Sequence, residues 1–177
     1  MRGPGPSSDR MYTTLQILKG ILDANHNRTQ IRKVIRNAWE HDCDDFFVGL
    51  DLATNPFYDF GLTLVPAIED DDDGDPGILT FEEFHRSALN LASGSLADIN
   101  KRKILEGLAL SANVTEWNLW YRRILLKTLG SHLPMDHIRD ALIYLTGSAT
   151  VLANNDALDG DDGENGSECN AGPNGPS

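Results

Sequence analysis

Apolar residues recur at spacings of three and four along most of this chain, and this period predicts amphipathic α-helices. The clearest stretch runs from Asn113 to Gly130, where Thr115 is the expected N-cap and Gly130 the expected left-handed residue at the end. Its apolar stripe holds Trp117, Trp120, Tyr121, Ile124, Leu125 and Thr128. One face of this helix is therefore expected to lie in a core.

Two helices are expected before this stretch, near the start of the chain. The first covers Met11–Asn25, and its apolar stripe holds Met11, Leu15, Leu18 and Leu22. Thr29 is expected to cap the second, which reaches about His41. Its apolar stripe holds Ile31, Val34, Ile35, Ala38 and Trp39.

Further helices are expected after residue 79. Thr80 and Glu83 form the pattern of a capping box at the start of one helix, and Gly94 is expected to end it. Ser95 is expected to cap the next helix, which reaches about Ser111. A last helix is expected to start near Pro134, with an apolar stripe of Ile138, Leu142 and Leu145.

Residues 42–79 break the helical period, because acids, prolines and glycines interrupt it. The apolar group Phe46–Leu50 is expected to extend or follow the second helix, and residues 57–65 to form irregular chain or a short strand. We expect the acidic stretch Glu69–Gly77 to be an exposed, mobile loop.

The predicted architecture is all-α, a single multi-helix bundle with an acidic loop insertion and disordered termini. The expected domain covers residues 11–146, with its acidic loop at 67–77. A disordered leader (1–10) precedes it, and an acidic, disordered tail (147–177) follows it.

The net charge of -12 is concentrated in two blocks. Residues 41–75 hold eleven Asp or Glu, residues 150–177 hold six, and neither block contains Lys or Arg, whereas residues 1–40 carry a net charge of +4. The helical parts can therefore keep basic surfaces for an anionic partner. The chain lacks a long apolar run and the pattern of a signal peptide, so we expect a soluble, cytoplasmic protein.

Patterns for a metal site are weak. Residues 72–84 match the second half of an EF-hand calcium loop, but Gly74 and Pro76 stand where oxygen ligands are required. An acidic loop before a capped helix is therefore favoured over a calcium site. His132 and His137 are five residues apart, which does not place them on one helix face as zinc ligands at i and i+4 would be.

Patterns for catalysis are also missing. Cys43 and Cys169 are far apart in the sequence, and they support neither a disulfide framework nor a thiolate metal site. No Gly-x-Ser-x-Gly, Walker-type lysine loop or Gly-x-Gly-x-x-Gly occurs. We therefore expect no catalytic residue, no metal and no cofactor.

Basic residues gather in two helical stretches that are either anion-binding surfaces or solvated helix faces. The earlier set spans Arg28 to Arg36, and both alternatives stay open for it. In the later set, Arg122, Arg123 and Lys127 occur with no acid among them. The turn Ser93-Gly94-Ser95 either joins two helices or presents a helix start to a phosphate. Such surfaces together would bind duplex DNA without sequence specificity.

Residues 77–129 resemble the N-terminal helical DNA-binding domain of ATP-dependent DNA ligases of the tailed-phage type. Three blocks carry the resemblance: GILTFEEF (77–84), the Ser93-Gly94-Ser95 turn before LADINKRKILEGL, and above all WNLWYRRILLKTL (117–129). Residues 11–50 resemble the first helices of that domain more loosely. In this family the domain is an all-helical bundle that grips the minor groove beside a nick through phosphates and sugars.

The resemblance implies a set of DNA-binding positions, to which two lysines of the neighbouring helix are added. They are Gly94, Ser95, Arg122, Arg123, Lys127, Lys101 and Lys103. The turn Gly130-Ser131-His132 departs from the family, which usually has Arg, Cys and Gly there. None of the five lysines stands in the Lys-x-Asp-Gly motif that takes AMP, so at most a noncatalytic part of a ligase is expected.

We therefore expect a noncatalytic module that binds duplex or nicked DNA in replication or repair. A separate ligase catalytic subunit is a further expected partner, no membrane is, and the cytoplasm can be that of a phage-infected host. The alternative is an acidic protein-interaction or regulatory module, acting as a ligase partner or a DNA mimic.

Overall fold

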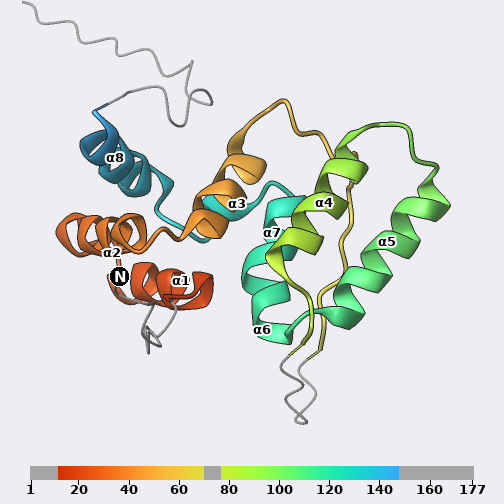
Figure 1. Ribbon diagram of the computed structural model, residues 1–177, viewed down its shortest axis with the longest axis horizontal. Helices are drawn as coiled ribbons and strands as arrows, with labels where there is room; N and C mark the ends of the chain where they lie inside the picture. The colour runs from red at the N-terminus through yellow and green to blue at the C-terminus, as the bar shows by residue number, and fades with distance from the viewer. Residues whose placement is uncertain (1–11, 70–76, 148–177) are drawn as a thin grey trace, which may run out of the picture.

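The computed structural model describes residues 12–69 and 77–147, and the chain is helical, with no strand, in these two ranges (Figure 1). The elements are α1 (Thr14–Asp23), α2 (Arg28–Glu40), α3 (Asp44–Thr54), α4 (Phe81–Ala92), α5 (Asp98–Ser111), α6 (Val114–Glu116), the π-helix η1 (Trp117–Tyr121), α7 (Arg122–Leu125), the 3-10 helix η2 (Leu129–Ser131) and α8 (Met135–Thr146). The predicted all-α fold is confirmed. The expected leader, most of the acidic loop and almost all of the tail lie outside the described residues.

The helices form two groups that meet at α3 and α7. Figure 1 shows α2 between α1 and α8 at one end of the molecule, and α4 and α5 at the other end. The helix α2 packs against α1 and α8, whereas α3 packs against α7 and so joins the two groups. The segment from Asn55 to Glu69 has no regular secondary structure and runs past the α4–α7 group (Figure 1).

Aromatic side chains fill the core where α3, α4 and η1 meet. Phe46 stacks on Trp120 with ring centroids 5.4 Å apart, and Phe84 lies against Tyr121 at 4.4 Å. Trp117 and Trp120 are fully buried, as the apolar stripe of their helix predicts. Burial of aromatic rings of this size dominates the energy of a small core.

The predicted start of α4 at Thr80 and its predicted end at Gly94 are confirmed. Thr80 caps α4, since its hydroxyl accepts from the Glu83 amide at 3.3 Å, and the Glu83 carboxylate accepts from the Thr80 amide at 3.2 Å. This reciprocal pair is the predicted capping box. Gly94 follows the end of α4 in the left-handed conformation, with φ of 70°.

Three predicted N-caps are wrong. Asn27, rather than Thr29, caps α2 by accepting from the Gln30 amide at 3.1 Å. Asn113, rather than Thr115, caps α6 by accepting from the amides of residues 115 and 116 at 3.0 and 3.2 Å. Ala97 replaces Ser95 at the start of α5, and no side chain caps that helix. In the first two cases an asparagine two residues earlier makes the same hydrogen bond that was expected of threonine.

The long helix predicted from Asn113 to Gly130 is divided and ends early. Trp117–Tyr121 forms a π-helix, and the helical run stops at Leu125. The left-handed residue is Lys127, with φ of 56°, whereas Gly130 lies in the 3-10 helix η2. The end of this helix is therefore set by the surroundings of Lys127 and not by glycine.

Some residues expected on apolar stripes lie at the rim of the bundle. Leu22 and Trp39 are 44% and 46% exposed. Trp39 still contacts the Phe47 ring, with centroids 5.5 Å apart. The buried face of each of these helices is therefore narrower than its predicted stripe.

Candidate nucleic-acid interface

The turn between α4 and α5 carries two of the predicted DNA-binding residues, Gly94 and Ser95. A Cβ atom added at Gly94 would meet nothing within 4 Å, so the turn is open to solvent and glycine is required there by its φ alone. The Ser93 hydroxyl donates to the Asn90 carbonyl at 2.7 Å and lies 2.9 Å from the Ser95 hydroxyl. These serines therefore finish α4 and leave the start of α5 uncapped.

The start of α5 presents amide groups that no capping side chain satisfies. Its N-cap is Ala97, and the first turn contains Asp98. Such a start has a positive partial charge and amides that point outward, which suits an anion, although Asp98 opposes one.

Lys127 is held by the end of α3. Its Nζ donates to the carbonyls of Leu52 and Asn55 at 2.7 and 2.8 Å. The ammonium also lies 5.2 Å from the centre of the Phe60 ring. Burial lowers the pKa of Lys127, while Asp51 and Asp59 act in the opposite direction. Its ammonium therefore has a structural role, because it satisfies carbonyls at the C-terminal end of a helix.

Arg122 and Lys101 hold the irregular segment that follows α3. The Arg122 Nε donates to the Val65 carbonyl at 2.7 Å, and the Lys101 Nζ donates to the Phe60 carbonyl at 3.5 Å. We call Lys101, Arg122 and Lys127 the carbonyl clamp, since each donates to backbone oxygens between residues 52 and 65. Buried carbonyl groups need partners, and irregular chain supplies few of its own.

Two side chains of η1 also form hydrogen bonds with the backbone of this irregular segment. The Trp117 Nε1 donates to the Pro66 carbonyl at 2.9 Å. Asn118 pairs with Ile68 in both directions, donating to its carbonyl at 2.8 Å and accepting from its amide at 3.1 Å. The sequence interpretation missed this role. The signal for it was the non-helical run 55–69, whose backbone groups had to find donors elsewhere.

Two further predicted cations, Arg123 and Lys103, also keep N–H donors. The Arg123 Nε donates to the Asn118 carbonyl at 3.1 Å, and burial together with Arg122 lowers the pKa of Arg123. Lys103 is exposed on α5, and within the described part of the chain no partner is recorded for it. Since a guanidinium has five N–H groups, Arg122 and Arg123 both retain donors after these backbone contacts.

The predicted residues are thus divided among three places. Gly94 and Ser95 lie on the α4–α5 turn, Lys101 and Lys103 on α5, and the remaining three at the end of the η1–α7 helix.

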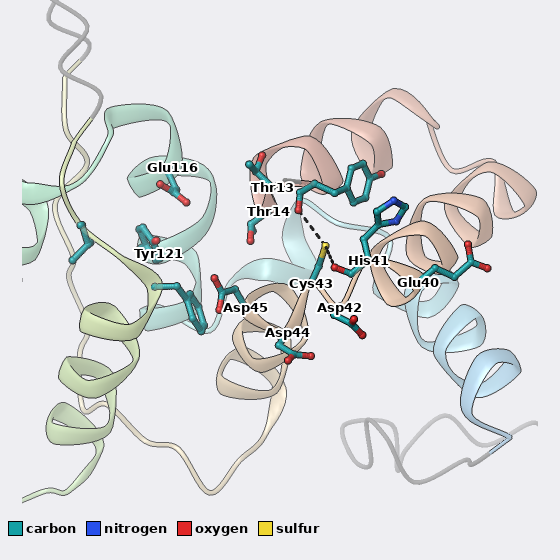
Figure 2. Close-up of a pocket in the computed structure, with 13 residues that line it drawn as sticks. Thr13, Thr14, Glu40, His41, Asp42, Cys43, Asp44, Asp45, Glu116 and Tyr121 are labelled. Carbon is teal, nitrogen blue, oxygen red and sulfur yellow. Dashed lines mark hydrogen bonds between the residues drawn. The ribbon is translucent and has the colours of Figure 1, made fainter. Parts of the chain in front are cut away.

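A cleft lined by carboxylates lies between the two helix groups (Figure 2). It has a volume of about 800 Å³, and its lining includes the acids Glu40, Asp42, Asp44, Asp45 and Glu116. Tyr12, His41, Cys43 and Tyr121 line it as well. Three acids of the stretch 41–75, which holds only acids among its charged residues, therefore line a concave surface.

Two carboxyl groups of this cleft, those of Glu116 and Asp45, are in surroundings that disfavour their ionised form. Burial raises the pKa of Glu116, a hydrogen bond from Tyr121 opposes the shift, and Asp45 adds to it. Burial and Asp44 likewise raise the pKa of Asp45. Figure 2 shows Glu116 and Asp45 on opposite sides of the cleft. A cation there would relieve their repulsion.

Cys43 is a half-buried thiol in the wall of the cleft. Its Sγ donates to the Tyr12 carbonyl at 3.1 Å. Burial raises its pKa, and the neighbouring Asp42, Asp44 and Asp45 raise it further. The thiol therefore stays protonated at neutral pH and is a poor nucleophile.

The described residues contain no cluster of metal-ligating side chains. The first five positions of the EF-hand-like stretch are Asp72–Pro76, which lie outside the described residues, while Glu83 at its last position is engaged in the capping box. No helix among the described residues is long and apolar enough to cross a membrane.

Two solved structures with ligase names are similar to this chain. The structure named "Pmar-Lig_PreS3" has 28% sequence identity and a TM-score of 0.65, and "Pmar-Lig_Pre." has 28% identity and a TM-score of 0.64. Each match covers 76% of this chain and 30% of the other chain, so this chain corresponds to less than a third of either. No family model and no curated protein matches. The fold is therefore ligase-related.

Proposed function

We propose that the helical bundle is a noncatalytic DNA-binding module of the kind found at the N-terminus of ATP-dependent DNA ligases. One observation carries the proposal: the chain matches ligase-named structures over 76% of its length but only 30% of theirs. The blocks of residues that resemble the DNA-binding domain lie within the bundle. The module would hold duplex or nicked DNA in replication or repair, without reading its sequence.

The chemistry of the predicted residues supports contacts with phosphates. The α4–α5 turn is open in front of Gly94, and the start of α5 next to it has no capping side chain. Arg122 and Arg123 retain N–H donors, and Lys103 is exposed. Lys127 and Lys101 act mainly through the carbonyl clamp, so we assign them a supporting role in shaping the surface.

Fluorescence polarisation with a labelled nicked duplex tests the proposal. The affinity should fall steeply with salt, since phosphate contacts release counterions, and it should be the same for unrelated DNA sequences. If no binding occurs at about 50 mM salt, where such contacts are strong, the proposal is wrong.

Replacing Arg122 and Arg123 together by alanine should weaken binding about tenfold for every sequence. The matched control is Lys19→Ala with Arg86→Ala, which removes the same charge from two exposed positions outside the proposed surface. Because Arg122 also holds Val65, thermal unfolding of both variants should accompany the titration. An equal loss in both pairs would remove Arg122 and Arg123 from the interface.

The acidic cleft favours a second candidate, a protein-interaction module that receives a basic segment. The pKa values of Asp45 and Glu116 are raised, and no Lys or Arg is among the described residues that line the cleft. Polylysine competition separates the two candidates. If a basic peptide binds and Asp45→Asn with Glu116→Gln abolishes that binding, the cleft is the site; if the variant binds the peptide equally well, it is not.

A further inference from the structure

The helices α2 and α8 build a basic surface that contains none of the DNA-binding positions implied by the resemblance. Arg32 and Arg36, one turn apart on α2, both approach the ring of Tyr144 on α8, with Cζ 4.6 and 5.9 Å from the ring centre. Lys33 is exposed beside them. We call Arg32, Lys33, Arg36 and Tyr144 the arginine face.

The guanidinium groups of this face keep their hydrogen-bond donors. A contact with an aromatic ring orients a guanidinium without using its N–H groups. Within the described part of the chain, no ion pair joins an acid to Arg32, Lys33 or Arg36, whereas Arg28 pairs with Asp140. The Arg32 Nε is buried and has no hydrogen-bond partner. A buried atom is out of reach of a phosphate, so the terminal N–H groups of the guanidinium are the donors that remain for one.

The positive charge of this surface is unusual in a chain that is acidic as a whole. The chain carries a charge of -12, yet α2 holds four Lys or Arg and its single acid is Glu40 at its last position. Tyr144 is 60% exposed and holds the two arginines in place at the rim of the α2–α8 pair. Pre-oriented guanidinium groups lose less entropy when they bind an anion.

We propose that the arginine face binds the phosphate backbone of a nucleic acid, as a second contact separate from the 94–95 and 122–123 positions. The proposal rests on the proposed function and extends its surface. The cations of the arginine face, from Arg32 to Arg36, cover about 6 Å of helix, and duplex DNA presents one charge per roughly 1.7 Å of its axis. A row of cations thus fits a repeated anion better than a single phosphate ion. Each guanidinium can bind a phosphate through two N–H groups.

The test is a salt titration with a nicked duplex for the full chain, for Arg32→Ala with Arg36→Ala, and for Lys19→Ala with Arg86→Ala. Loss of two phosphate contacts should lower the slope of log K against log salt by about 2 and weaken binding about tenfold or more. The control pair should change the slope by well under 1. Equal slopes and affinities in the two pairs would overturn the proposal.

The same titration separates failure of this inference from failure of the proposed function. If the full chain binds no DNA, the proposed function fails together with this inference; if it binds and only the Arg32/Arg36 pair is without effect, this inference alone fails. Residues 150–177 hold six acids and no base, so a synthetic peptide of this sequence is a second probe. Binding of that peptide by the arginine face, with unchanged DNA binding in the variant, would assign the face to a protein segment instead.

A second variant distinguishes a loss of DNA binding from a loss of folding. Arg32→Lys with Arg36→Lys keeps both charges but loses the planar group of donors and its stacking on the ring. It should weaken DNA binding about threefold or more, and its thermal unfolding should stay close to that of the unmodified chain. Unchanged affinity in this variant would contradict a role for the guanidinium groups.

Discussion

Lys127 shows why a basic residue in a sequence motif need not be a ligand contact. Its ammonium donates to two backbone carbonyls that precede it by 75 and 72 residues in the chain. These contacts also explain how a residue other than glycine is held at φ of 56°, a conformation that costs about 1 kcal/mol or more. Substitution of Lys127 is therefore expected to affect the stability of the fold more than the binding of DNA.

Replacing Lys127 by methionine should destabilise the bundle by about 1–3 kcal/mol, because the Leu52 and Asn55 carbonyls lose a charged donor. Urea unfolding measures the change. Lys103→Met is the control, since Lys103 is exposed and has no recorded partner in the described part of the chain. It should change stability by less than about 0.5 kcal/mol. Equal effects would mean that the clamp contributes nothing to the fold.

Glu116 predicts a pH effect with a definite sign. Burial raises its pKa in the folded state above that of the unfolded chain, so its ionised form costs stability at neutral pH. This cost disappears as the pH falls through the folded pKa. Glu116→Gln should therefore stabilise the chain at about pH 7.5 by well under 1 kcal/mol, since the carboxyl is partly solvated.

The advantage of Glu116→Gln over the unmodified chain should shrink as the pH is lowered toward 5. Thermal unfolding of both proteins across this range measures the difference. A variant that is less stable at neutral pH, or a gap that grows on acidification, would contradict the assigned direction of the shift.

At the scale of elements, the packing of α3 against the η1–α7 helix requires the two helices to approach closely at Gly49. A Cβ added at Gly49 would lie 2.3 Å from Cζ2 of Trp120 and 3.2 Å from Cδ1 of Ile124. The Trp120 ring is fully buried and stacks on Phe46, so it has little room to move. Gly49 is therefore required by the contact between these helices and not by its φ.

Gly49→Ala should destabilise the protein by about 1–3 kcal/mol through overpacking. Gly107→Ala is a matched control on α5, where an added Cβ meets nothing within 4 Å. That change should stabilise the helix by about 0.5–1 kcal/mol, since alanine is the better helix former. Melting temperatures that shift in the same direction for both variants would contradict this explanation.

The parts that could be predicted from the sequence depend on near neighbours. The Thr80–Glu83 capping box spans three residues, and the buried stripe of Trp117, Trp120 and Ile124 follows from the helical period alone. The carbonyl clamp could not be predicted in the same way, because its partners are 41 to 75 residues apart. The early end of the η1–α7 helix follows from those distant contacts, so Gly130 was the wrong choice.

At the scale of the whole molecule, charge is separated by structure as well as by sequence. Asp42, Asp44 and Asp45 line one cleft with Glu40 and Glu116, and the three cations of the arginine face are not among the residues that line it. This separation explains how a chain of charge -12 can offer basic surfaces to a polyanion. Salt should weaken DNA binding and leave the fold little changed, since the core is apolar and the described ion pairs are few.

The measurement that tests DNA binding most directly is an NMR titration of the 19.5 kDa chain with a short nicked duplex. The amide signals of Gly94, Ser95, Lys103 and Arg123 should shift together at low salt, and those of Arg32 and Arg36 with them. Signals that line the acidic cleft, such as Asp45 and Glu116, should stay in place. Shifts confined to the cleft, or no shift at about 50 mM salt, would contradict the proposed interface.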